Sequence, residues 1–197
     1  MDGALLTALG LAAPAGLNAY LPLLVLAIGD RLSTTITLAR PYDALSSTWS
    51  IALIVLLLTI ELVVDKIPGL DHANDLLGSV LRPAAGAVLA MAATSDTDAV
   101  NPVVALVLGL LAAGAVHAAK ATTRPVVTVA TGGIGNPLIS MVEDAVAGVT
   151  AVIALLLPWL AVALVVVLAL AFLWARRRLR RVRPAILSRF TSTTLRQ

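Results

Sequence analysis

One stretch between two apolar runs carries a concentration of residues that could do chemistry. It extends from Glu61 to Pro83, reads ELVVDKIPGLDHANDLLGSVLRP, and contains six charged side chains: Glu61, Asp65, Lys66, Asp71, Asp75 and Arg82. A charge at bilayer depth costs on the order of several kcal/mol unless it is paired, hydrated or functional. So many charges close together therefore indicate either an ion-pair network or a binding site.

The spacing within this stretch predicts two facing helices. The two acids at the end of the first apolar run are four residues apart and share a helix face, and Asp71, Asp75 and Arg82 share a face at the start of the next. The Pro-Gly pair after Ile67 is a turn signal that ends the first helix. Two antiparallel helices joined so tightly would bring carboxylates and a guanidinium face to face.

Further charges recur at helical spacing later in the chain. One apolar run ends with His117, Lys120 and Arg124 on a single stripe. The run after the glycine-rich segment carries Glu143 and Asp144 about two turns beyond its Asn-Pro start. A polar Asn18 follows a Pro-Ala-Gly break in the first run. We expect these side chains to join the same site.

The acids in this set outnumber the bases. Six carboxylates (Glu61, Asp65, Asp71, Asp75, Glu143, Asp144) face Lys66, Arg82, Lys120, Arg124 and the titratable His117. The excess favours protons on one or two acids, or a divalent cation such as Mg²⁺ or Ca²⁺, with Asp65, Asp71 and Asp75 as its ligands. The alternative is a mutual ion-pair network that locks the helix ends.

Two of the basic groups allow other interpretations. His117 is either a proton relay or a hydrogen-bonding spacer beside Lys120. Lys120 and Arg124, followed by the glycines 132–135 and a helix start, form a weak candidate for an anion site. This is not a Walker loop, because no Lys-Ser or Lys-Thr follows the glycines.

Composition places these charges in a membrane protein. Hydrophobic residues make up 59% and charged residues 13% of the 197 residues, against roughly 25% charged residues in soluble proteins. Several apolar runs approach the roughly 20 residues that cross a bilayer as a helix, and none alternates as a barrel strand would. The fold class is therefore all-α, a polytopic helix bundle. Cysteine is absent from the sequence, which excludes disulfides and thiolate sites.

About six transmembrane helices are predicted, at 3–28, 49–66, 72–93, 102–122, 136–157 and 158–174. The break at Pro14–Gly16 indicates either a kink in the first helix or a discontinuous helix whose broken end faces a substrate. Residues 126–135 are too glycine-rich for a helix interior, so the start of the fifth helix is also expected to be broken. The first helix is interpreted as retained, because it lacks the positive start of a signal peptide.

The basic residues predict the topology. Eight of the fourteen Lys and Arg residues follow position 175, which divides the chain into a transmembrane domain, 1–175, and a basic cytoplasmic tail, 176–197, that touches anionic lipid. Counting six spans back from this tail places both termini in the cytoplasm and the charged residues at the cytoplasmic ends of their helices. An acidic body with a basic tail does not indicate nucleic-acid binding.

Three segments resemble a known family. GLNAYLPLL (16–24), ELVVDKIPGLDHANDLLGSVLRPAAGA (61–87) and the pair HAAKATTRP and GNPLISMVED (117–125 and 135–144) are similar to the bacterial membrane family named domain of unknown function 4126. The resemblance implies a small multi-span protein of the bacterial inner membrane, with the polar positions above as its characteristic residues. It implies no activity.

Three functions fit these observations. The first is a small transporter- or channel-like protein whose acidic cluster binds a cation or protons, with or without coupling to a solute. The second is a non-catalytic membrane subunit or assembly factor, acting as a homo-oligomer or with a membrane-complex partner, whose Ala and Gly residues allow close helix contact. The third, ranked last, is a metal-dependent enzyme acting on a phosphorylated lipid.

Overall fold

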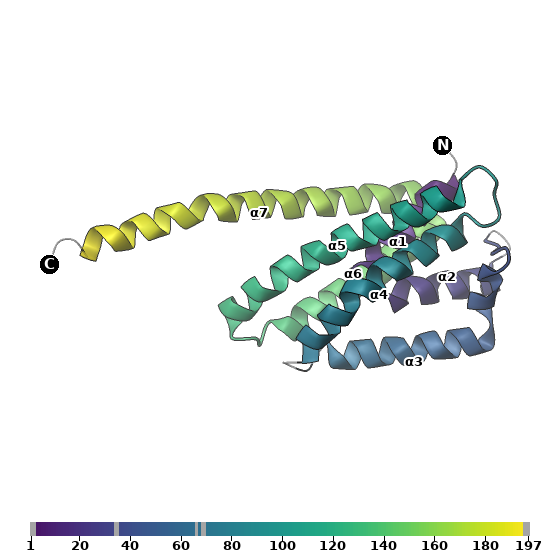
Figure 1. Cartoon of the computed structure of the whole chain (residues 1–197), viewed down its shortest axis with the longest axis horizontal. Helices are drawn as coiled ribbons and strands as arrows, with labels where there is room; N and C mark the ends of the chain where they lie inside the picture. The colour runs from purple at the N-terminus through teal and green to yellow at the C-terminus, as the bar shows by residue number, and fades with distance from the viewer. Residues whose placement is uncertain (1–2, 34–35, 66, 68–69, 195–197) are drawn as a thin grey trace.

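The computed structural model describes residues 3–33, 36–65, 67 and 70–194, with side chains described except at 70–73 and after Arg178. Throughout this part the regular structure is helical (Figure 1). The helices are α1 (Gly3–Ala15), α2 (Tyr20–Leu32), a short 3₁₀ helix η1 (Tyr42–Ser46), α3 (Thr48–Val64), α4 (Leu70–Ala93), α5 (Pro102–Thr131), α6 (Asn136–Leu156) and α7 (Pro158–Thr194). The predicted all-α class is confirmed.

Within the described part of the chain, four segments are long and apolar enough to cross a membrane. They are Asn74–Ala93, Pro102–Thr131, Asn136–Leu156 and Pro158–Arg178, and two shorter apolar helices accompany them, Gly3–Ala15 and Thr48–Val64. Helices of about 20 apolar residues match the thickness of the hydrocarbon core. A helical membrane bundle is therefore the architecture of this chain.

The first predicted span is discontinuous, and its second half turns back. A Cβ on Gly10 of α1 would lie 2.8 Å from the Cβ of Ala154, and one on Gly29 of α2 would lie 2.7 Å from Leu155 Cδ1, so both helices pass the same end of α6. Between them, Asn18 contacts Asp144, nearer the other end of α6. Helices α1 and α2 thus form a re-entrant hairpin whose tip lies inside the bundle (Figure 1).

The hairpin changes the predicted topology. Since α1 and α2 enter and leave at one end, the start of α1 and the end of α7 lie at opposite ends of the bundle (Figure 1). A first segment that crossed completely would have placed them at the same end, so the structure differs from the prediction in the single first span 3–28. The reason is local: Gly16 has no side chain, and a Cβ there would collide with the carbonyl oxygen of Ala113 in α5. The chain can therefore turn against α5 at this point.

Helix α5 is longer than the sequence predicts. It continues through Pro125 to Thr131, so the expected irregular structure is wrong for residues 126–131. Two threonine hydroxyls support this last part, Thr128 donating to Arg124 O at 2.9 Å and Thr131 to Val127 O at 2.8 Å. The helix ends at Gly132, whose φ of 61° is left-handed and favours glycine. Helix α6 begins at Asn136, as predicted.

Helix α7 does not end at Trp174. It runs on to Thr194 and extends past the other helices (Figure 1). At the end of its apolar part, the Arg178 guanidinium lies over the Trp174 ring, 5.2 Å from the ring centroid. The division of the chain at residue 175 remains a prediction, since the helix is continuous there.

Small residues allow the central helices to pack closely. Helix α1 contacts α4, α5, α6 and α7, and the buried residues at these contacts are largely alanines. Helices α4 and α5 meet at Gly86 and Gly109, where a Cβ on Gly86 would lie 2.7 Å from Gly109 O. In a membrane, such close backbone approach supplies much of the packing energy between helices.

Candidate functional site: a buried charged cluster at the hairpin tip

The charged residues predicted to share a site do meet in the bundle interior. We call this set the charged cluster, and it comprises Glu61, Asp65, Asp75, Arg82, His117, Lys120, Arg124, Glu143 and Asp144, with Asn18. It lies deeper than the expected helix ends, because Arg82 is midway along α4 and α5 continues beyond Arg124. Helices α3 to α6 and the hairpin tip all contribute to it.

Arg82 is the centre of the first half of the charged cluster. Its side chain is 1% exposed; Nη2 donates to Glu61 Oε1 at 3.0 Å, and Nη1 donates to Asp75 Oδ1 at 3.1 Å. The same Nη1 lies 3.0 Å from His117 Nδ1. Because arginine can only donate, this ring nitrogen accepts, and a neutral His117 carries its proton on Nε2. One guanidinium therefore links α3, α4 and α5.

Gly78 provides the space for this guanidinium. A Cβ at Gly78 would lie 3.0 Å from Arg82 Cζ and 3.1 Å from Nε and Nη1. Those distances are tighter than an ordinary contact, so a side chain at residue 78 would push the guanidinium away from its partners. Residue spacing does not predict this role, because it does not show that Arg82 folds back along its own helix.

The second half of the charged cluster is built around Asp65 and Glu143. Arg124 Nη2 donates to Asp65 Oδ2 at 3.0 Å and to Glu143 Oε2 at 3.1 Å, and Lys120 Nζ lies 3.5 Å and 3.0 Å from the same two oxygens. Ser140 donates to Asp65 Oδ2 at 3.0 Å. Arg124 Nη1 also lies 3.4 Å from Asp75 Oδ2, which joins this half to Arg82.

Asp65 is held as a carboxylate. It directly follows the last residue of α3 and accepts a hydrogen bond from Asn74 Nδ2 at 2.6 Å. The Lys120 ammonium and the Arg124 guanidinium both face this carboxylate. Asp65 therefore acts as an anchor for the two cations.

The hairpin tip connects directly to the charged cluster. Lys120 Nζ donates to the carbonyl of Leu17, just past the end of α1, at 2.9 Å. Asn18 Oδ1 accepts from the backbone N–H of Tyr20 and of Leu21, both at 3.0 Å, and so caps the start of α2. The Asn18 amide donates to Asp144 Oδ1 at 2.9 Å. A cation at a helix C-terminus and an amide at the next N-terminus together stabilise the break.

Negative charge remains in excess among the described residues. Five carboxylates of the charged cluster face three permanent cations, Arg82, Lys120 and Arg124. Asp144 is bound by an uncharged amide, and Glu61 Oε2 is buried with no hydrogen-bond partner. The site as described is therefore electrically incomplete, and one or two protons or a bound cation would balance it.

One of the three predicted metal ligands, Asp71, lies outside the described side chains, as does Lys66. Among the residues that are described, no group of three or more His, Asp or Glu is arranged to hold a metal ion. Metal binding by Asp65, Asp71 and Asp75 remains a prediction. The anion site gains no support, since Lys120 and Arg124 both bind carboxylates.

Sequence reasoning missed several members of the site. Asn74 and Ser140 each bind Asp65, and the Leu17 carbonyl accepts from Lys120. Asn74 and Ser140 lie on the same helices as the predicted acids, so a closer reading of polar residues near those acids could have found them. The carbonyl has no sequence signal at all.

Replacing Asn18 with alanine tests the hairpin tip. We expect a loss of about 1–2 kcal/mol in unfolding free energy, because the cap of α2 is removed and Asp144 loses its partner. Asn101→Ala is the matched control, since Asn101 caps α5 through Val103 N and Val104 N and lies outside the charged cluster. Unfolding in detergent measures both variants. Both variants should lose a similar amount of unfolding free energy through the missing cap, and only Asn18→Ala should also alter the titration of Asp144. Unchanged stability of Asn18→Ala would contradict the assignment.

Fold and site together define a helical integral membrane protein with a re-entrant hairpin and a buried charged cluster. The family model described as Domain of unknown function (DUF4126) matches residues 5–178, and the chain belongs to that family. No curated protein and no solved structure matches the chain. The family confirms the resemblance carried by the three sequence segments and adds no activity.

Proposed function

We propose that this protein is a small transporter- or channel-like membrane protein that binds protons or a cation at the charged cluster. The observation that carries the proposal is the excess of carboxylates over cations in the charged cluster, at the tip of a re-entrant hairpin. Asp144 and Glu61 are the two acids with incomplete partners. Ionisable residues inside a membrane commonly mark ion pathways and proton relays.

The hairpin supports this proposal independently of the charges. Irregular backbone at membrane depth is tolerated where it is buried in protein or lines a hydrated cavity. In transporters, broken helices often supply their exposed ends to a substrate or coupling ion. Here the broken ends at Leu17 and Asn18 contact Lys120 and Asp144, so movement of the tip would alter the charged cluster.

Asp144 borders a shallow groove on the surface of α6. The groove has a volume of about 420 Å³ and is lined by Asp144 and by apolar residues of α6, including Val149 and Val152. An acid that borders a groove can exchange a proton or cation more readily than one enclosed on all sides. Asp144 is therefore our first choice for the exchanging group, with Glu61 as the second.

The proposed orientation places the basic part of α7 in the cytoplasm of a bacterial inner membrane. The positive-inside rule favours this placement of the arginines that follow Trp174. Because α1 starts at the other end of the bundle, we propose that it begins on the opposite face. Anionic lipid at the basic tail and a homo-oligomeric or membrane-complex partner remain proposals as well.

Flux through reconstituted protein tests the function. In liposomes carrying a pH-sensitive dye, the wild type is expected to dissipate an imposed pH or cation gradient. Asp144→Asn and Glu61→Gln each remove one carboxylate and leave the described salt bridges of Asp65 and Glu143 intact. For each variant we expect at least about a tenfold loss of flux. Asp98→Asn, in the exposed loop before α5, is the matched control and should retain wild-type flux.

The opposite results would favour the second candidate function. If the wild type moves neither protons nor Na⁺, K⁺ or Mg²⁺, or if both variants keep full flux, transport through the charged cluster is wrong. The cluster would then be an ion-pair network that fixes the fold of a non-catalytic membrane subunit. The specific observation that favours this alternative is that Arg82, Lys120 and Arg124 each bind two carboxylates or more.

A further inference from the structure

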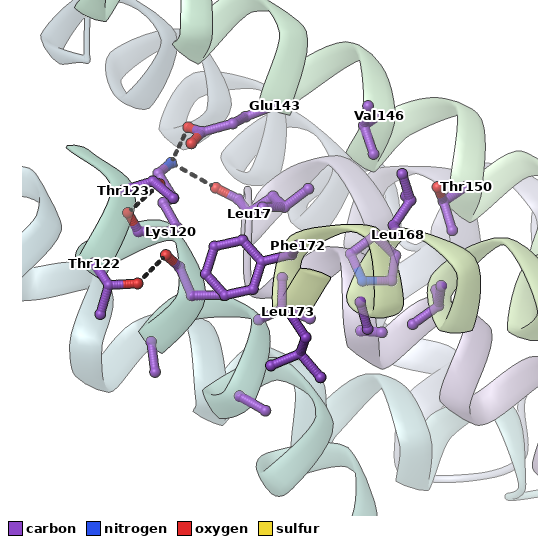
Figure 2. A pocket seen from close by; sticks show the side chains of 18 of the residues that line it. Leu17, Lys120, Thr122, Thr123, Glu143, Val146, Thr150, Leu168, Phe172 and Leu173 are labelled. Atoms are coloured by element: carbon purple, nitrogen blue, oxygen red, sulfur yellow. Dashed lines mark hydrogen bonds and ion pairs between the residues drawn. The ribbon is translucent and has the colours of Figure 1, made fainter. Parts of the chain in front are cut away.

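A cavity separates α7 from the rest of the bundle. Its volume is about 530 Å³, and residues of α1, α5, α6 and α7 line it (Figure 2). Small-molecule sites typically have volumes of roughly 300–1,000 Å³. Its walls are mainly apolar, with Val146 of α6 and Leu168 and Phe172 of α7 among them. The cavity is therefore large enough for part of an elongated apolar ligand.

The polar residues on the wall differ in whether they are already bound. At one end of the cavity Lys120 contacts Glu143 and Leu17, as Figure 2 shows, and also Asp65, so its three donors have partners. Arg176 also lines the cavity and is exposed. Arg176 is thus the cation on this wall that can receive an anionic group.

The position of the cavity indicates a lipid. The apolar part of α7 is only 6% buried by the bundle, so this helix and the cavity beside it face the hydrocarbon of the membrane. Arg176 follows Trp174 at the end of that apolar part, where headgroups are expected. At a rise of 1.5 Å per residue, Leu168 lies about 12 Å from Arg176 along α7. A chain that starts at Arg176 can therefore reach into the cavity.

The charge around Arg176 favours an anionic headgroup. Two further arginines follow directly, and no Asp or Glu occurs in the sequence after Asp144. The end of α7 therefore carries no carboxylate that could neutralise these arginines. Arginine binds phosphate through paired N–H donors. A zwitterionic headgroup would bring its own cation close to the same cluster of arginines and would be less favoured.

We propose that this cavity holds one acyl chain of an anionic phospholipid whose phosphate is bound by Arg176. The acyl chain would fill the space between α7 and the other helices. The site is separate from the hydrogen bonds of Asp144 and Glu61, so the proposal does not depend on any transport activity.

Native mass spectrometry of the full-length protein in nonionic detergent tests this site. The probe is an equal mixture of phosphatidylglycerol and phosphatidylcholine with identical acyl chains. We expect one phosphatidylglycerol to be retained per protein, with a preference over phosphatidylcholine on the order of tenfold. Arg176→Gln should reduce that preference several-fold, whereas Arg177→Gln, whose side chain does not line the cavity, should change it less than twofold.

A second pair of variants tests the cavity itself. Ala169 lines it and Ala171 does not, so Ala169→Leu should lower the retention of the lipid several-fold and Ala171→Leu should leave it unchanged. Size-exclusion chromatography verifies that every variant is folded. Equal retention of both lipids by the wild type, or full retention by Ala169→Leu, would overturn the proposal, because both results describe ordinary lipid around a membrane protein. Unchanged preference in Arg176→Gln would overturn the role of that arginine.

Discussion

Replacement of Arg82 by methionine is expected to cost about 3–5 kcal/mol of unfolding free energy. Arg82 is almost completely buried and donates to Glu61 and Asp75. Without it, the carboxylate of Glu61 remains inside the bundle with no cation bonded to it, and His117 loses its donor. An uncompensated charge in the membrane interior is among the most destabilising changes a helix bundle can undergo. Unfolding in mixed detergent micelles, followed by circular dichroism, measures the change.

Two further variants separate the loss of the ion pairs from a general effect of removing an arginine. Arg31→Met changes an exposed arginine at the end of α2 and should alter stability by no more than about 0.5 kcal/mol. Adding Glu61→Gln to Arg82→Met should recover part of the lost unfolding free energy, because a neutral amide then replaces the unpaired carboxylate. Wild-type stability of Arg82→Met would show that the buried ion pairs do not hold α3, α4 and α5 together.

Gly109→Ala is the second change with a large expected effect. A Cβ at residue 109 would collide with the carbonyl oxygen of Gly86 and lie 2.6 Å from Ala90 Cβ, and backbone cannot move aside as a flexible side chain can. Helices α4 and α5 would have to separate. Overpacking of this kind typically costs about 1–3 kcal/mol of unfolding free energy and occasionally more. For Gly109→Ala we expect a loss of about 3 kcal/mol, at the upper end of that range. Thermal unfolding in detergent measures the loss.

The same helix supplies the control. At Gly114 the nearest atom to an added Cβ is Pro83 Cγ at 3.8 Å, an ordinary contact. Gly114→Ala should therefore be neutral or stabilise the protein by up to about 1 kcal/mol, because alanine is the better helix former. If both alanine variants behave alike, the glycine contact between α4 and α5 is not the determinant of packing at this crossing.

Much of the helical framework could be predicted from the sequence because its signals are local. Apolar runs of membrane length, the Asn-Pro start at Asn136 and the absence of alternation predict an all-helical membrane protein whatever the helices pack against. The residues of the charged cluster could also be predicted, since charges in apolar runs must be paired or hydrated. The length of α5 could not, because a proline within an apolar run normally predicts a helix end, whereas this helix continues through Pro125 to the left-handed Gly132.

What the sequence by itself determined was therefore the class of protein and the membership of its polar site. Only the tertiary structure decided that the first apolar run folds back as a hairpin, because Gly16 permits contact with α5 and Asn18 finds Asp144, which lies 126 residues away. Only the tertiary structure paired Arg82 with His117 and placed Lys120 at the end of α1. The physical reason is that helix periodicity fixes which side chains share a face, whereas the partner of that face depends on the close contacts between helices.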